Sequence, residues 1–138
     1  MEFLAELHET CMTENQIATI IVDRAFKVHK TLGPGLLETV YQAALKYELE
    51  KHGLQVQMER PIPVYYEDIK LEVGFRADLI VNRKVIVECK SVEALSPIFA
   101  KILLTYLRLT DVHLGLLINF NVILIKDGIR RVVNELPE

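Results

Sequence analysis

The chain has 138 residues, 51% of them hydrophobic and 25% charged, which fits one globular domain over residues 1–138 with residues 1–13 as an N-terminal extension. Its net charge of −3 argues against binding nucleic acid by bulk electrostatics, so such a partner would need a local basic patch. No apolar run reaches the ~18 residues that cross a bilayer, and the acidic start lacks the basic residues of a secretory signal, so we expect no membrane contact and a cytoplasmic location.

Two helices are predicted in the first part of the chain. Thr13 and Gln16 have the spacing of a capping box, and the apolar residues behind them recur at helical spacing, which predicts a helix over about 14–31. A Gly-Pro-Gly sequence ends it. A second helix is expected over about 36–52, with Gly53 placed to cap its C-terminus.

Strand patterns fill the middle of the chain. Residues 54–59 alternate between apolar and polar side chains, as in a half-buried strand. Pro61 and Pro63 exclude the stretch that follows from the centre of a sheet, because proline lacks the N–H that a central strand needs. After a turn at 67–68, the alternation returns over 69–75.

A β-hairpin and a third helix are predicted next. Residues 75–91 form two apolar-rich segments around the polar loop 82–84, which indicates a hairpin. The third helix is expected over about 96–109, with Ser96 as its N-cap and Pro97 at its first position.

The last part of the chain predicts further strands. Residues 115–120 are nearly all apolar, as in a strand covered on both faces. The segments 122–126 and 129–133 flank Asp127-Gly128, a strong hairpin turn. The order of elements predicts an α/β fold, a mixed sheet flanked by helices.

The cysteines and histidines do not predict a zinc site. Cys11 and Cys89 form no C-x-x-C pair, and the four histidines are scattered. We expect free thiols in a reducing compartment.

The hairpin over 75–91 carries the candidate chemistry. A three-residue loop pairs Val81 with Val85 and sets Asp78 opposite Glu88. Because side chains alternate along a strand, one face is expected to be entirely apolar. That face would hold Phe75, Ala77, Leu79, Val81, Val85, Val87 and Cys89. The other face would hold Arg76, Asp78, Ile80, Ile86, Glu88 and Lys90.

Two opposed carboxylates repel each other unless a cation compensates them. Mg²⁺ is suited to this, because it prefers oxygen ligands and takes one or two carboxylates together with phosphate oxygens and water. Lys90 stands two residues from Glu88 on the same face, where an ammonium could orient a water nucleophile or stabilise charge on a phosphate. Asp78, Glu88 and Lys90 are therefore the minimum apparatus for hydrolysing a phosphodiester.

The same spacing is compatible with a solvated hairpin face that has no function. In that case Arg76 would pair with Glu88, and Lys90 with Asp78. The pattern D-x9-E-x-K is short, so spacing alone leaves both interpretations open.

Motifs elsewhere in the chain favour the functional interpretation. Asp78 with the Glu88-Cys89-Lys90 sequence, behind a helix that carries an acidic residue, resembles the core of PD-(D/E)xK nucleases. Residues 35–41 match the G-x-x-E-x-x-Y signature of the GxxExxY protein family within that superfamily, and the segments 105–110 and 114–120 also look like that family. The resemblance covers about residues 15–134.

The resemblance implies a restriction-endonuclease-like α/β/α fold in a single nuclease-like domain. It also implies cleavage of DNA or RNA that depends on Mg²⁺, with Mn²⁺ as a substitute, and hence a nucleic-acid partner. A homo-oligomer is compatible with this reading. Asp78 and Glu88 would bind the metal, Lys90 would activate water or stabilise charge, and Glu38 would assist as a third acid.

The role of Glu38 has two interpretations. Instead of assisting as a third acid, Glu38 could be a first-turn residue favoured by the helix dipole. Tyr41 is expected to pack and to orient Glu38 through its hydroxyl, in a supporting role.

The basic groups expected to contact phosphate are Arg76, Lys101 and Arg108.

The sequence departs from the resembled pattern beside the site. Ala77 stands where the superfamily's name has proline, which is a mild change. The third helix of the GxxExxY family often carries His and Gln, and this chain has Phe99 and Ile102 at the aligned positions. These departures support the alternative function, a catalytically inactive nuclease-fold module that binds nucleic acid or a protein partner.

Overall fold

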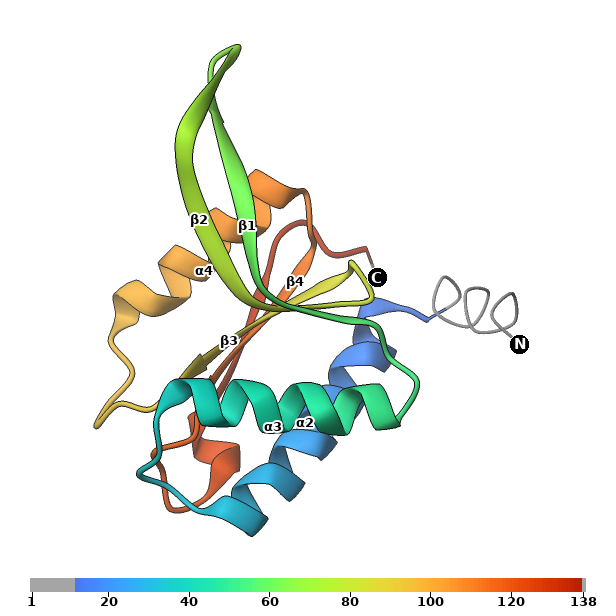
Figure 1. The fold of residues 1–138 in the computed structure, drawn as a ribbon, viewed down its shortest axis with the longest axis vertical. Coiled ribbons are helices and arrows are strands. Elements are labelled where there is room, and N and C mark those ends of the chain that lie inside the picture. The colour runs from blue at the N-terminus through green and yellow to red at the C-terminus, as the bar shows by residue number, and fades with distance from the viewer. Residues whose placement is uncertain (1–11, 138) are drawn as a thin grey trace.

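The computed structural model describes residues 12–137, which form a mixed sheet with helices on both faces, as expected (Figure 1). Most of the predicted N-terminal extension, including His8 and Cys11, lies outside the described residues. Within residues 12–137, no helix is long and apolar enough to cross a membrane.

The sheet has five strands in the order β1-β2-β3-β4-β5. Only β3 and β4 are parallel, and every other neighbouring pair is antiparallel. A parallel pair needs a long crossover connection, and the third helix provides it. The strands are β1 (Val56–Tyr66), β2 (Ile69–Val81), β3 (Val85–Lys90), β4 (Leu114–Asn119) and β5 (Ile129–Val133).

The three predicted helices are present as α2 (Glu14–Leu32), α3 (Glu38–Lys51) and α4 (Pro97–Thr110). The capping box at the start of α2 is confirmed, with reciprocal bonds between the side chains and backbones of Thr13 and Gln16. Helix α4 begins with proline at its first position, as predicted.

The core has two layers, one on each face of the sheet. On one face, α2 and α3 bury Ile21 and Leu45 against β3 and β4. On the other, α4 buries Leu103 and Leu107 against Ile86 and its neighbours. All of β4 is buried, which confirms the prediction of a strand covered on both faces. These two layers enclose β3 and the C-terminal end of β2.

The predicted strand over 122–126 is wrong. Residues Ile125–Gly128 form a 3₁₀ turn (η1), and β5 pairs with β4 instead, Ile129 opposite Ile118. A side chain on Gly128 would put its Cβ 2.2 Å from the Asn119 carbonyl oxygen, so the glycine permits a close approach rather than a hairpin turn. Short apolar runs are ambiguous between strand and other conformations, and this segment adopts the 3₁₀ turn in which Ile125 is buried.

The first two strands form a long ribbon that projects beyond the body of the molecule (Figure 1). β1 continues through Pro61 and Pro63 as an edge strand, in agreement with their exclusion from the centre of the sheet. The two segments expected at 69–75 and 75–81 are one continuous strand, β2. We call the projecting residues 61–76 the arm.

Candidate functional site

Asp78 and Glu88 lie on adjacent antiparallel strands, as predicted. The pairs Leu79–Val87 and Val81–Val85 set the register that places them opposite each other. The Cys89 N–H donates to Asp78 Oδ2 at 2.9 Å, and the Asp78 N–H donates to Glu88 Oε1 at 3.3 Å. Each carboxylate is thus fixed by a backbone N–H of the opposite strand at the end of the β2–β3 pairing.

The predicted division of the hairpin into two faces is only partly right. Cys89 and Leu79 do pack in the layer under α2 and α3. Phe75 and Ala77, however, pack on the α4 side with Ile80, so β2 changes face at Asp78. The reason is local: the Asp78 N–H bonds a carboxylate, and the partner strand opposite it is interrupted by a residue with positive φ, Glu59 (55°).

Burial strongly affects the carboxylate pair. Glu88 is only 7% exposed, and burial first, then the charge of Asp78, raise its pKa from 4.5 to about 8. The pKa of Asp78 is also raised, again mainly by burial. Within residues 12–137, no ion pair joins Lys90 to Asp78 or Arg76 to Glu88, so the pairing expected of a nonfunctional surface is not formed. Near neutral pH, Glu88 therefore retains its proton unless a cation approaches.

Lys90 lies beside the pair at the end of β3. Its Nζ stands 4.6 Å from the centre of the Phe99 ring, a cation–π contact, and its charge lowers the pKa of both carboxyls against the effect of burial. Glu88, Lys90 and Phe99 line a small hollow of about 100 Å³, together with Ile102 and other side chains of α4. The two departures from the resembled pattern therefore face the candidate site.

Glu38 is brought to the same end of β3. Its Oε2 accepts from the Ser91 N–H at 3.4 Å, and the Ser91 hydroxyl donates to the Leu36 carbonyl at 2.7 Å. Glu38 is also the first-turn acid of α3, so its position agrees with both alternatives. Among residues 12–137, no group of three or more His, Cys, Asp or Glu side chains is arranged to hold a metal ion. Asp78 and Glu88 are the two carboxylates of the site that could hold a metal ion directly.

Tyr41 packs as predicted, but its hydroxyl has another partner. The buried ring stacks on Phe120 with centroids 4.5 Å apart. The hydroxyl donates to the Gly33 carbonyl at 2.6 Å and accepts from the Leu36 N–H at 3.1 Å. The expectation that it orients the Glu38 carboxylate is therefore wrong. It fixes the loop before α3, because the unpaired backbone groups of that turn need a partner.

The three predicted phosphate-contacting residues are not gathered in one place. Arg76 is exposed at the base of the arm, two residues before Asp78. Lys101 and Arg108 are exposed on α4, about 140–160° around the helix axis from Tyr106, whose ring lines the hollow. Of the three, only Arg76 is close in sequence to one of the two carboxylates.

Two residues near the site were not predicted. Asn119 ends β4 beside Lys90, and its buried amide bonds both the N–H (3.1 Å) and the carbonyl (3.0 Å) of Val92, which fixes the loop after Lys90. Tyr106 stacks on Phe75 with centroids 4.0 Å apart, and burial, then the charges of Glu88 and Asp78, raise its pKa. A polar residue at the end of an all-apolar strand was the available signal for Asn119.

Comparison with known proteins identifies the family of this chain. A family model described as the PD-(D/E)XK nuclease superfamily matches residues 15–132, which include both layers of the core and the carboxylate pair. No significant match was found among curated proteins or among solved structures. The narrower GxxExxY resemblance stays a prediction from the motifs.

Proposed function

The chain belongs to the PD-(D/E)XK nuclease superfamily, and from that premise we propose that it is a Mg²⁺-dependent nuclease that hydrolyses phosphodiester bonds in DNA or RNA. Nucleases of this superfamily usually use divalent metals. The observation that carries the proposal is the pair of opposed carboxylates, half-buried Asp78 and buried Glu88, with the ammonium of Lys90 at the same strand end.

The donor set fits a divalent ion. Asp78 and Glu88 offer only oxygen ligands, and each carboxylate uses one oxygen for a single backbone N–H, which leaves lone pairs for a cation. Two carboxylates are the number that Mg²⁺ commonly takes from a protein when phosphate and water complete its shell. When bound, the ion would supply Lewis-acid polarisation of a phosphate oxygen and a lower pKa for an attacking water.

The surrounding residues have separate tasks in this proposal. Lys90, kept at the site by the Phe99 ring, stabilises negative charge on the phosphate or orients water. Glu38 assists indirectly, because its bond to the Ser91 N–H fixes the backbone next to Lys90. Arg76, at the base of the arm, is the basic residue that we assign to a phosphate of the substrate.

A second candidate function rests on the α4 side of the site. Phe99 and Ile102 line the hollow beside Glu88 and Lys90, where they offer no hydrogen bond to a substrate or a water. A net charge of −3 also gives little bulk attraction to nucleic acid. Both observations favour an inactive nuclease-fold module that binds nucleic acid or a protein.

The two functions are separated by calorimetric titration with Mg²⁺ and Mn²⁺, followed by cleavage assays on single- and double-stranded DNA and RNA. Asp78→Asn should leave the fold as stable, or slightly more stable, without metal, because it removes a charge whose burial is unfavourable, and should weaken metal binding and abolish cleavage. Lys90→Ala should preserve or tighten metal binding by removing a positive charge, yet reduce cleavage by about 10- to 100-fold.

Metal binding by the wild type without any metal-dependent cleavage would favour the inactive module. The metal site itself would be refuted by a wild type that binds neither ion at millimolar concentration together with an Asp78→Asn variant that is less stable without metal. In that case the pair would be a structural hydrogen-bonding element only.

A further inference from the structure

The arm has more exposed apolar surface than its own fold explains. Val73 is 75% exposed and Ile69 63% exposed, and Tyr66, paired with Ile69, is also exposed. A two-stranded ribbon without a third layer is only marginally stable in water. Exposed apolar residues that lie together, rather than singly, mark an interaction surface.

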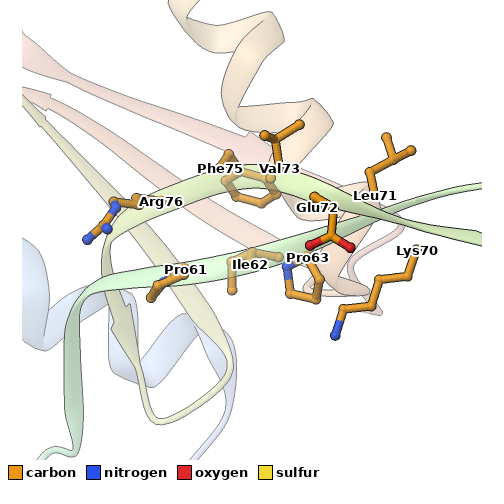
Figure 2. A pocket seen from close by; sticks show the side chains of 10 residues that line it. Pro61, Ile62, Pro63, Lys70, Leu71, Glu72, Val73, Phe75 and Arg76 are labelled. Atoms are coloured by element: carbon orange, nitrogen blue, oxygen red, sulfur yellow. The ribbon is translucent and has the colours of Figure 1, made fainter.

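The apolar residues of the arm share one face. Ile69, Leu71, Val73 and Phe75 are at alternate positions of β2, and Phe75 stacks on Tyr106 of α4. Figure 2 shows Leu71 and Val73 pointing to one side of the ribbon, while the charged ends of Lys70 and Glu72 point to the other. A hollow of about 620 Å³ runs along this part of the arm, and neither Asp78 nor Glu88 lines it.

A second exposed apolar surface lies on α4. Ile98, Ile102 and Leu109 are exposed and are spaced i, i+4 and i+11, so they form one stripe along the outer side of the helix. Lys101 and Arg108 are exposed beside this stripe. The whole of α4 contains no Asp or Glu, so the charged side chains of the helix itself are all positive.

The two surfaces complement each other in charge as well as in polarity. The tip of the arm is the exposed turn Glu67-Asp68, which directly adjoins Ile69 and Tyr66. A negative tip next to apolar side chains fits a positive helix face next to apolar side chains. Pro61 and Pro63 remove two N–H donors from the edge of β1, so contact through the face of the arm is favoured over addition of a strand to its edge.

We propose that the arm of one copy packs across the α4 stripe of a second copy, with the contact repeated by two-fold symmetry to form a dimer. Each copy provides both an arm and a stripe, which is the requirement for a symmetric, self-complementary interface. Val73 and Ile69 would cover Ile102 and Leu109, and Glu67-Asp68 would approach Lys101 and Arg108. The contact uses neither carboxylate, and it shares only Ile102 with the hollow beside Glu88, so dimerisation can be measured independently of nuclease activity.

Sedimentation velocity from about 1 to about 200 µM tests the dimer. The wild type should dimerise in this range. Val73→Asp should raise the dissociation constant at least about 10-fold, because it places a charge in the apolar contact. Ile123→Asp is the matched control: Ile123 is 92% exposed, but it lies on the connection to η1, and its substitution should leave the dimer unchanged. Circular dichroism checks that each variant is folded.

A charge exchange gives a sharper readout than loss of contact. Arg108→Glu alone and the pair Glu67→Lys with Asp68→Lys should each weaken the dimer about 3- to 30-fold, and their combination should restore it. A wild type that is monomeric throughout the range, or a dimer unaffected by Val73→Asp, would overturn the proposal.

The cations of α4 also allow a discriminating outcome. If they bind nucleic acid instead, Lys101→Glu with Arg108→Glu should reduce binding of a fluorescent oligonucleotide and leave the oligomeric state unchanged. That result would refute the dimer contact and return these residues to a substrate role.

Discussion

The contact between Lys90 and Phe99 shows how one aromatic residue can take over a positioning task. The ammonium would otherwise be free to move on a flexible stem, and the ring face 4.6 Å away gives it a preferred place beside the carboxylates. Phe99 cannot donate a hydrogen bond, so this attraction is the polar contribution that it can make at the site.

We therefore predict that Phe99→Leu reduces cleavage while Phe99→Tyr, which keeps a ring, retains it. A cation–π contact contributes about 0.5–2 kcal/mol, which corresponds to a loss of about 2- to 30-fold in kcat. KM should change little, because Phe99 acts by contacting Lys90 and not by contacting the substrate. Single-turnover kinetics on the best substrate measures this. An equal loss in both variants would mean that the ring only fills space.

The sequence specified part of the site at this scale. The length of the loop 82–84 was sufficient to place Asp78 opposite Glu88, because pairing on either side of a short loop fixes the register. The sequence could not predict the partner of the Tyr41 hydroxyl, because that hydroxyl bonds the backbone of a loop. Nor could it predict the change of face at Asp78, which depends on a bond between a backbone N–H and a carboxylate.

Among the elements, the arm depends on one very close approach between its strands. A Cβ on Gly74 would lie 2.0 Å from the carbonyl oxygen of Ile62, a distance that real side chains do not allow. Gly74 pairs with Pro63, next to the irregularity in the β1–β2 register. The glycine thus permits the ribbon to keep its shape where the strands leave the body of the protein.

Gly74→Ala should consequently distort the arm and lower the free energy of unfolding by about 1–3 kcal/mol. Urea denaturation measures the loss, and limited proteolysis should show faster cleavage within residues 61–76. Glu72→Ala, at a nearby exposed position, is the control and should change stability by less than about 0.5 kcal/mol. A Gly74→Ala variant as stable and as protease-resistant as the wild type would contradict this account.

Element boundaries were predictable where the signals were local. The capping box began α2, and Pro97 began α4, because both act within one helical turn. The strand over 122–126 failed, since its apolar residues are compatible with several conformations and only packing against β4 and α2 selects one. Parallel pairing of β3 with β4 is also a long-range property that no local pattern specifies.

At the scale of the whole molecule, the buried carboxyl of Glu88 links stability to pH. Burial raises the pKa of Glu88 from 4.5 to about 8, so between these values the folded protein keeps a proton that the unfolded chain has lost. Unfolding then releases a proton, and stability falls as the pH rises through this window. The effect is absent below pH 4.5, where both states are protonated, and reaches its full size above about pH 8.

We predict that the metal-free protein, kept in EDTA, is less stable at pH 8 than at pH 5 by about 3–4 kcal/mol on account of Glu88, since each pH unit between the unfolded and folded pKa values corresponds to at most about 1.4 kcal/mol. Glu88→Gln cannot ionise but can still accept from the Asp78 N–H, so most of this pH dependence should disappear in the variant. Urea denaturation of both proteins at the two pH values measures the difference. Parallel pH dependence in the two proteins would show that Glu88 ionises normally. The carboxylate pair would then need no cation to make its ionisation favourable.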